Sequence, residues 1–197
     1  MKEIIKGTRY ASLHCKGSNT NRLPYNKYFE LKKDNLLNSG DFCVEEWFGL
    51  DFQNNDGGRE KAGYKGSTGD CVTRSIAIAS GLPYQKVYDD LYNLSKEWRL
   101  KSNSSHAKTA NPENDSPRTG VFKDVYDPYI KSLGFVWVPT MKIGSGCKVH
   151  LRKGEIPSGK LIVRVSKHIT SVINGVINDT YNCSRSGTRC VYGYYIK

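Results

Sequence analysis

Two segments in the middle of the chain carry apolar residues at the spacing of an α-helix. Residues 72–80 are rich in Ile and Ala and are followed by Gly81, a residue favoured just after the last turn of a helix, so a short buried helix is predicted. A longer helix is predicted after Leu82-Pro83, because the next apolar side chains recur at intervals of four, three and four residues. Those side chains are Val87, Leu91, Leu94 and Trp98.

A third helix is predicted between Phe122 and Leu133, where apolar and aromatic residues share one face and Gly134 ends the pattern. Pro128 lies inside this segment. Because proline lacks a backbone N–H and clashes with the preceding turn, we expect it to kink or break the helix. Residues 101–118, between the second and third helices, are rich in Ser, Asn, Lys and Pro and predict a loop.

From Phe135 onward the pattern changes to short runs rich in β-branched and aromatic residues, which are typical of strands. Asn174-Gly175 separates two such runs and is a strong signal for a tight hairpin. Helices followed by antiparallel strands indicate an α+β fold. The predicted strands are residues 135–139, 160–165, 168–173, 176–181 and 188–196.

The first fifty residues have a weaker pattern. We predict that residues 1–50 form an N-terminal extension or small subdomain, ahead of a main domain at 51–197. Residues 22–30 alternate loosely, which favours a strand, and residues 45–50 are predicted to pack as a short apolar patch. A turn is predicted at 54–58, where two Asn, an Asp and two Gly follow one another.

Composition and charge limit the classes of protein. A chain of 197 residues with 38% hydrophobic residues and a net charge of +11 fits a folded globular protein. No apolar run has the length of a membrane span or of a signal-peptide core, so we expect no membrane partner and a cytoplasmic location, in the host cytoplasm if the chain is phage-encoded. The six cysteines are then expected to be reduced thiols.

The C-terminal part of the chain is basic. From residue 151 onward there are eight Lys and Arg against two acidic residues. Such a balance favours an acidic partner or nucleic acid. The simpler alternative is a solvated surface whose charge aids solubility.

Cys71 lies at the junction between a polar, glycine-containing loop at 65–70 and the first predicted helix. At such a position the free N–H groups and the macrodipole of the helix favour a thiolate, the nucleophilic form of cysteine. The sequence therefore predicts a nucleophile here.

The hairpin predicts which residues accompany Cys71. A two-residue loop at 174–175 makes Thr170 face Asp179, so that His168 and Asp179 are diagonal neighbours on one face of the sheet. Asn178 points to the opposite face. We therefore predict His168 as the base and Asp179, rather than Asn178, as the group that orients it. The Cys71 backbone N–H is predicted to supply half of an oxyanion hole.

This order, with a cysteine on a helix first and then a histidine and an aspartate on a sheet, resembles the papain-like cysteine peptidase superfamily. Within it, three segments are similar to a group of small phage and bacterial proteins: GDCVTRSIAIASG at 69–81, GSGCKVHL at 144–151 and GTRCVYGY at 187–194. The likeness covers residues 51–195 and excludes the first fifty.

The resemblance implies a papain-like fold, a Cys71/His168/Asp179 triad and attack on an amide of a protein or peptide substrate through a thioester. Peptidase, amidase and transglutaminase chemistry all occur in the superfamily. Papain-type enzymes place a Gln about six residues before the cysteine to complete the oxyanion hole, and Lys65 stands there instead. Ser67, Thr68 or a second backbone N–H are the candidate replacements.

A non-catalytic alternative remains open. Cys71 can be a small buried residue at the start of a core helix, with His168 and Asp179 as ordinary strand and turn side chains. The protein would then be an inactive papain-fold binding protein that engages an acidic protein or nucleic acid.

Other groupings of reactive residues are weaker. Cys147, His150, Cys183 and Cys190 offer metal ligands, but the six residues between Cys183 and Cys190 do not match the usual paired zinc knuckles, so no metal or cofactor is expected.

Two further motifs are weaker candidates. The loop Gly144-Ser145-Gly146 lacks the Lys-Ser/Thr ending of a phosphate-binding loop and is expected to shape the rim of the site. His14 with Cys15, and His150 as a rival base, lie in segments without a predicted scaffold.

Overall fold

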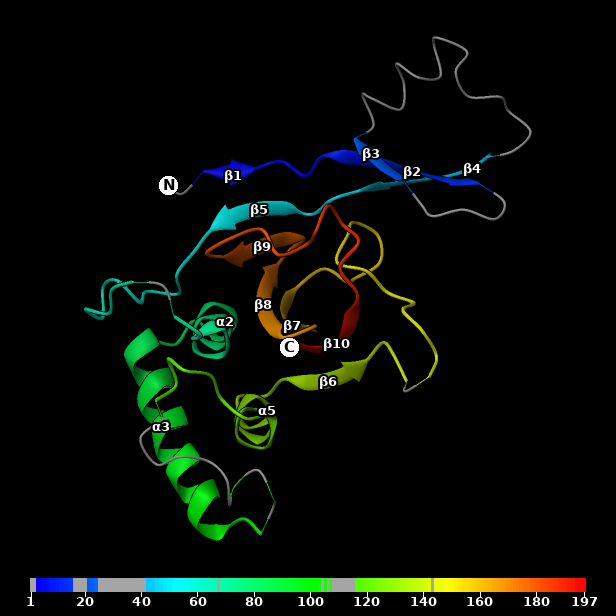
Figure 1. The fold of residues 1–197 in the computed structure, drawn as a ribbon. Helices are drawn as coiled ribbons and strands as arrows, with labels where there is room; N and C mark the ends of the chain where they lie inside the picture. The colour runs from blue at the N-terminus through cyan, green and yellow to red at the C-terminus, as the bar shows by residue number, and fades with distance from the viewer. Residues whose placement is uncertain are drawn as a thin grey trace.

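The protein is an α+β molecule in which helices pack on one large sheet (Figure 1). This confirms the predicted α+β class. The computed structural model describes residues 3–15, 21–24, 42–66, 68–103, 105, 107, 116–142 and 144–197.

The main sheet has seven strands in the order β1-β5-β9-β8-β7-β10-β6. Its neighbours are antiparallel except for β5 and β9, which run parallel. The strands are β1 (Ile4–Ile5), β5 (Asp51–Asn54), β6 (Val136–Pro139), β7 (Lys160–Val165), β8 (His168–Ile173), β9 (Val176–Asp179) and β10 (Val191–Ile196). All five predicted C-terminal strands are therefore present, with β6, β9 and β10 shorter than expected. The short strand β5 was not predicted.

The described part of the chain has three helices on one side of the sheet: α2 (Cys71–Ser80), α3 (Tyr84–Lys101) and α5 (Lys123–Ser132), with α3 packed against the other two. Their positions confirm the three predicted helices, and Gly81 takes the left-handed conformation that ends α2. Pro128 lies inside α5, which continues to Ser132, so the expectation of a break is wrong. Most of the predicted loop at 101–118 lies outside the described residues.

Two apolar clusters occupy the two faces of the sheet, as the alternation of side chains along a strand requires. Ile162 of β7 and Ile169 of β8 face the helices and pack with Val72 and Ile76. The residues of β7 that alternate with Ile162, such as Leu161, point to the other face of the sheet. They pack in the second cluster with buried side chains of β5, β8 and β9. The helix-side cluster fixes α2 against β8, and this contact sets the position of the candidate site.

The N-terminal region is divided between two sheets. Strands β2 (Arg9–Cys15), β3 (Asn21–Pro24) and β4 (Phe42–Phe48) form a separate three-stranded sheet. By contrast, β1 pairs with β5 at the edge of the main sheet. Trp47 is buried and donates to the Ser186 carbonyl oxygen at 2.7 Å, which joins the small sheet to the main one. The predicted strand at 22–30 corresponds in part to β3, and residues 25–30 lie outside the described residues.

Cys147 and Cys190 form a disulfide that links the segment before Leu151 to the start of β10. The expectation that all cysteines are reduced is therefore wrong for this pair. It also removes the weighed zinc set, because sulfurs bonded to each other cannot act as thiolate ligands. Cys71 and Cys183 are free thiols. In the part of the chain that is described, no helix combines the length and the apolar character that crossing a bilayer requires.

Candidate active site

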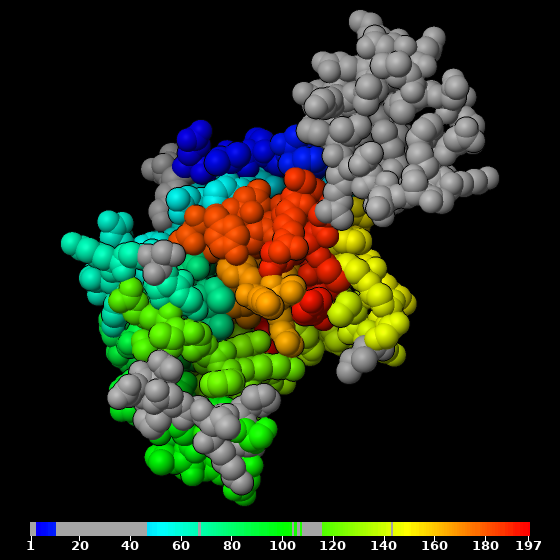
Figure 2. All heavy atoms as spheres, in the orientation of Figure 1, coloured from blue at the N-terminus to red at the C-terminus, as the bar shows by residue number. Residues whose placement is uncertain are grey.

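Cys71 is the first residue of α2 and is partly buried in the wall of a cleft of about 690 Å³. We call this hollow the Cys71 cleft. Its walls come from the start of α2, the segment 119–126, the β7–β8 turn and the end of the β8–β9 hairpin. In Figure 2 the yellow-green atoms near residue 120 and the orange atoms of residues 164–181 lie side by side on the face shown. The structure thus places the predicted nucleophile at an accessible helix start.

His168 is the first residue of β8 and lies beside Cys71. A hydrogen bond holds the helix and the strand together here, because the Ser75 hydroxyl donates to the Ile169 carbonyl oxygen at 3.0 Å. His168 Nε2 is 2.7 Å from Asp179 Oδ2. That bond leaves Nδ1 as the ring nitrogen that faces the thiol.

The predicted hairpin register is confirmed, because Ile173 pairs with Val176 and Val172 with Ile177. This register brings Asp179 to the imidazole. Asn178 points to the other face, where its Oδ1 accepts a hydrogen bond from Asn55 Nδ2 at 3.1 Å. The structure therefore brings together Cys71, His168 and Asp179 and leaves Asn178 out.

A buried network of alternating charges supports these residues. Arg74 donates through Nη1 to Asp179 Oδ1 at 2.5 Å and through Nε to Asp70 Oδ1 at 2.9 Å. The Tyr84 hydroxyl donates to the second Asp70 oxygen at 2.8 Å. Asp70, Arg74 and Asp179 are all buried. A continuous line of hydrogen bonds therefore runs from Tyr84 through the two carboxylates and the guanidinium to His168.

Sequence reasoning missed Arg74. One local signal was available, since Asp70 and Arg74 are four residues apart across the start of a helix, the spacing of a helical ion pair. Its second partner, Asp179, is 105 residues further along the chain, and no local pattern indicates that contact. Because Asp70 uses both oxygens on Arg74 and Tyr84, its side chain does not cap α2.

The shifts in pKa follow from these contacts. Burial alone favours neutral groups, but in each case the partners outweigh it. For Cys71 the hydrogen bond and charge of His168, with the Ile169 N–H and Arg74, lower the pKa of the thiol. For His168, hydrogen bonds to Asp179, Cys183 and Cys71 and the charge of Asp179 raise the pKa of the imidazole well above its ordinary value of 6.5.

Asp179 completes this pattern. Burial raises the pKa of its carboxyl, but the hydrogen bond from His168 and the charge of Arg74 lower it overall. All three shifts favour the same state, in which a Cys71 thiolate faces a His168 imidazolium held by an ionised Asp179. This is the reactive form of a nucleophilic cysteine.

Cys183 is an unpredicted neighbour of the imidazole. It is buried, and its ligand atom lies within 4.8 Å of those of His168 and Asp179. These three groups could in principle hold a metal ion. The Asp179 carboxylate, however, already binds His168 and Arg74, and the adjacent guanidinium charge opposes a cation.

The predicted oxyanion donors have different outcomes. The Cys71 N–H is at the first position of α2, where backbone donors have no intrahelical partner. Thr68 lines the cleft, but its hydroxyl donates to the Arg118 carbonyl oxygen at 2.5 Å and is therefore engaged. Ser67 lies outside the described residues. The second donor stays a prediction.

The competing candidates are elsewhere. His150 Nδ1 is 3.0 Å from a Glu155 oxygen, and this residue does not line the Cys71 cleft. The Gly144-Ser145-Gly146 loop does not line it either, and Ser145 instead donates to the Lys142 carbonyl oxygen at 2.8 Å. His14 and Cys15 lie on β2, so they do have a strand scaffold, but their side chains are outside the described part of the structure.

Comparison of the chain with protein-family models, curated proteins and solved structures finds no significant match. The resemblance to papain-like peptidases thus stays a prediction. The chemistry of Cys71, His168, Asp179 and the network behind them is the basis for any functional proposal.

Proposed function

We propose that the protein is a cysteine-dependent hydrolase or acyltransferase with a papain-like fold, acting on an amide of a protein or peptide. One observation carries this proposal: a helix-start thiol contacts an imidazole whose other nitrogen is 2.7 Å from a buried carboxylate. This is the arrangement that nucleophile, base and orienting group require.

The reaction follows from the charge state of the pair. The Cys71 sulfur attacks the carbonyl carbon of the amide and forms a C–S bond, and the carbonyl oxygen becomes an oxyanion near the Cys71 N–H. His168 gives its proton to the leaving nitrogen as the C–N bond breaks, which leaves a thioester and a neutral imidazole. Water or an amine then attacks the thioester, His168 accepts its proton, and the thiolate is released.

Asp179 and Arg74 act on this sequence through His168. Asp179 holds the proton-bearing Nε2, so that Nδ1 faces the sulfur, and stabilises the imidazolium. Arg74 touches no reacting atom, and we assign it as a positioning residue that keeps Asp179 ionised and fixed. A cytoplasmic location is part of the same proposal.

Alkylation by iodoacetamide tests the proposal without a known substrate. We expect Cys71 to react at pH 7 at least tenfold faster than an ordinary cysteine in a peptide, because its pKa is lowered. His168→Ala and Asp179→Asn should both slow the reaction. Cys183→Ser, which removes the other free thiol among the described residues, is the matched background, and peptide mapping assigns the label to Cys71 in all measurements. Labelling of Cys71 at the rate of an ordinary thiol, unchanged in His168→Ala, would exclude the proposed pair.

The second candidate is a non-catalytic protein that binds an acidic protein or nucleic acid. The excess of eight basic over two acidic residues after residue 150 favours it. Salt-sensitive retention on heparin or DNA that is unchanged in Cys71→Ser, combined with an unreactive Cys71, would favour this candidate.

A further inference from the structure

The Cys71 cleft is positively charged. Four of its lining residues are Lys or Arg, and none of its described lining residues is Asp or Glu. One of the four, Arg74, is neutralised by the buried carboxylates of Asp70 and Asp179. For the other three, the described part of the chain offers no carboxylate in a salt bridge. They are Lys123, Arg164 and Lys167.

These three cations come from three different elements around the thiol. Lys167 is exposed in the two-residue turn between β7 and β8, which the pairing of Val165 with His168 closes. It is the residue immediately before His168 in the chain. Arg164 lies on β7 two residues after Ile162, on the face that carries the helices and Cys71. Lys123 begins α5, 6.0 Å from the Trp137 ring centre, and acts weakly on Asp127, which is itself paired with Lys131.

Aromatic side chains form the remaining wall. The side chains of Phe122 and Tyr181 are 46% and 49% exposed, which is high for large aromatic residues. The Tyr181 ring centre is 5.2 Å from that of His168, so this surface borders the reacting groups. A ligand in the cleft would therefore meet aromatic faces beside the thiol and positive charges around it.

We propose that the Cys71 cleft takes acidic peptide segments as acyl donors, with Asp or Glu side chains of the substrate next to the amide that is attacked. This inference rests on the proposed function, because it assigns the substrate of the same thiol. Unpaired cations around a concave site raise the local concentration and the association rate of an anionic ligand. A nucleic acid is the weaker match, since its backbone presents phosphodiesters and no acyl carbon to the sulfur.

Three tetrapeptide probes test the inference, each carrying an N-terminal iodoacetyl group and four Glu, four Gln or four Lys. Rates of Cys71 labelling are measured in the Cys183→Ser background and normalised to the reaction of the same probes with a cysteine-containing peptide. We expect the Glu probe to react about tenfold faster than the Gln probe at low salt, and the Lys probe to react slowest. High salt should reduce the difference.

Variants locate the source of the preference. Lys167→Gln, Arg164→Gln and Lys123→Gln should each lower the Glu-to-Gln rate ratio about twofold to threefold. Lys160→Gln is the matched control, because Lys160 is at the opposite end of β7 from Arg164 and does not line the cleft. It should leave the ratio unchanged.

The outcomes separate this inference from the proposed function. If plain iodoacetamide labels Cys71 rapidly but the Glu-to-Gln ratio is near one, the thiol is reactive and the acidic-substrate inference is wrong. If the three cleft variants and Lys160→Gln lower the ratio equally, the preference comes from net charge and the inference is also wrong. A single-stranded oligonucleotide that blocks all three probes, without a preference for Glu, would assign the cleft to nucleic acid. Slow labelling by iodoacetamide itself would instead contradict the proposed function.

Discussion

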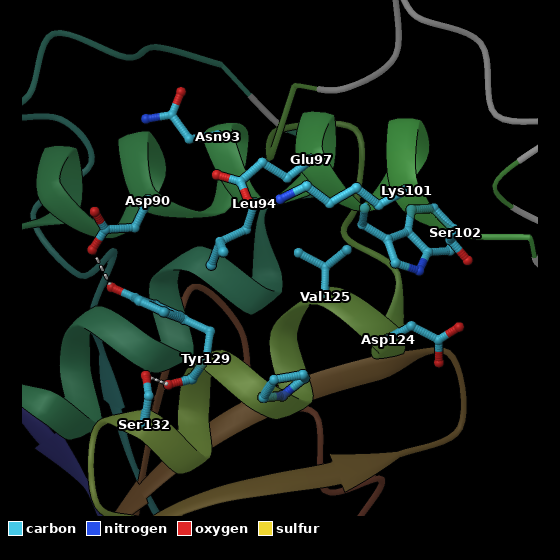
Figure 3. Close-up of a pocket in the computed structure, with 12 residues that line it drawn as sticks. Asp90, Asn93, Leu94, Glu97, Lys101, Ser102, Asp124, Val125, Tyr129 and Ser132 are labelled. Carbon is cyan, nitrogen blue, oxygen red and sulfur yellow. Dashed lines mark hydrogen bonds and ion pairs between the residues drawn. The ribbon is translucent and has the colours of Figure 1, made fainter.

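Two of the hollows in the described part of the molecule are similar in size and different in construction. The Cys71 cleft measures about 690 Å³, and a groove between α3 and α5 measures about 740 Å³. Figure 3 shows this α3–α5 groove, with Leu94 and Val125 on its floor and Asp90, Glu97 and Lys101 on the α3 side. The charged α3 residues of this groove are paired within the helix, as Glu97–Lys101 and Lys86–Asp90, and they are accessible to solvent.

At the Cys71 cleft, by contrast, the paired charges are buried and connect different elements of the fold. Asp70, Arg74 and Asp179 are buried, and the pairs they form connect α2 to the far end of the β8–β9 hairpin. Ionised groups are rarely taken out of water unless each has a partner. The depth and connectivity of the charges, and not the size of the hollow, distinguish the Cys71 cleft from the α3–α5 groove.

Arg74→Ala should give the largest effect. It removes the guanidinium that two buried carboxylates share and leaves Asp70 with the more distant Arg59 and Asp179 with His168, so we expect the free energy of unfolding to fall by about 3 kcal/mol. Urea denaturation measures the change. Arg74→Lys, which keeps the charge but loses the fork that spans both carboxylates, should be intermediate. If Arg74→Ala is no more destabilising than a substitution in the α3–α5 groove, the two regions do not differ as described.

Cys71→Ser should change how stability depends on pH. The raised pKa of His168 contributes stability below its unfolded value of 6.5 that is lost as pH rises toward the folded value. The lowered pKa of Cys71 works in the other direction, because the folded thiolate forms while the unfolded thiol, with an ordinary pKa of about 8.5, keeps its proton. Between the pKa values of the unfolded imidazole and the unfolded thiol, the folded thiolate–imidazolium pair binds one proton. The unfolded neutral thiol and imidazole also bind one, so the two contributions to the pH dependence cancel.

In Cys71→Ser only the histidine contribution remains. We therefore expect the stability of this variant to fall by about 1 kcal/mol per pH unit from pH 6.5 to 8.5, relative to the parent protein. Urea denaturation at three pH values gives both slopes. Equal slopes in the two proteins would show that the thiol and imidazole do not share a proton in this way.

Glu97→Gln should give the smallest effect. The Glu97–Lys101 pair is exposed, with side chains that are 59% and 77% accessible, and such pairs contribute little. We expect the free energy of unfolding to change by less than about 0.5 kcal/mol and the alkylation rate of Cys71 to stay constant. A change in that rate would mean that the α3–α5 groove and the Cys71 cleft are coupled.

Local signals predicted much of the fold and the central residues of the site. The Asn174-Gly175 turn determined the register of the hairpin, and the period-2 alternation then selected Asp179 over Asn178. Helix spacing and Gly81 gave the position of α2, and so the place of Cys71 at its start.

The features that were not predicted depend on contacts between distant residues. The strand β5 has only four residues and pairs in parallel with β9 across more than a hundred intervening positions. The Cys147–Cys190 disulfide joins residues 43 positions apart, and Cys183 reaches the imidazole only through the folding of the loop after β9. Neither spacing nor residue type indicates these long-range contacts, because they depend on how distant strands and loops pack together in the folded protein.

The pH dependence of the alkylation rate of Cys71 shows whether its thiol shares a proton with His168. In the Cys183→Ser background, mass spectrometry can follow iodoacetamide labelling of Cys71 from pH 4 to 10. The thiolate–imidazolium pair predicts a rate that is already high at neutral pH and falls only in acid, with an apparent pKa well below the ordinary value of about 8.5 for cysteine. A rate that rises with pH through about 8.5, with the same profile in His168→Ala, would contradict the account.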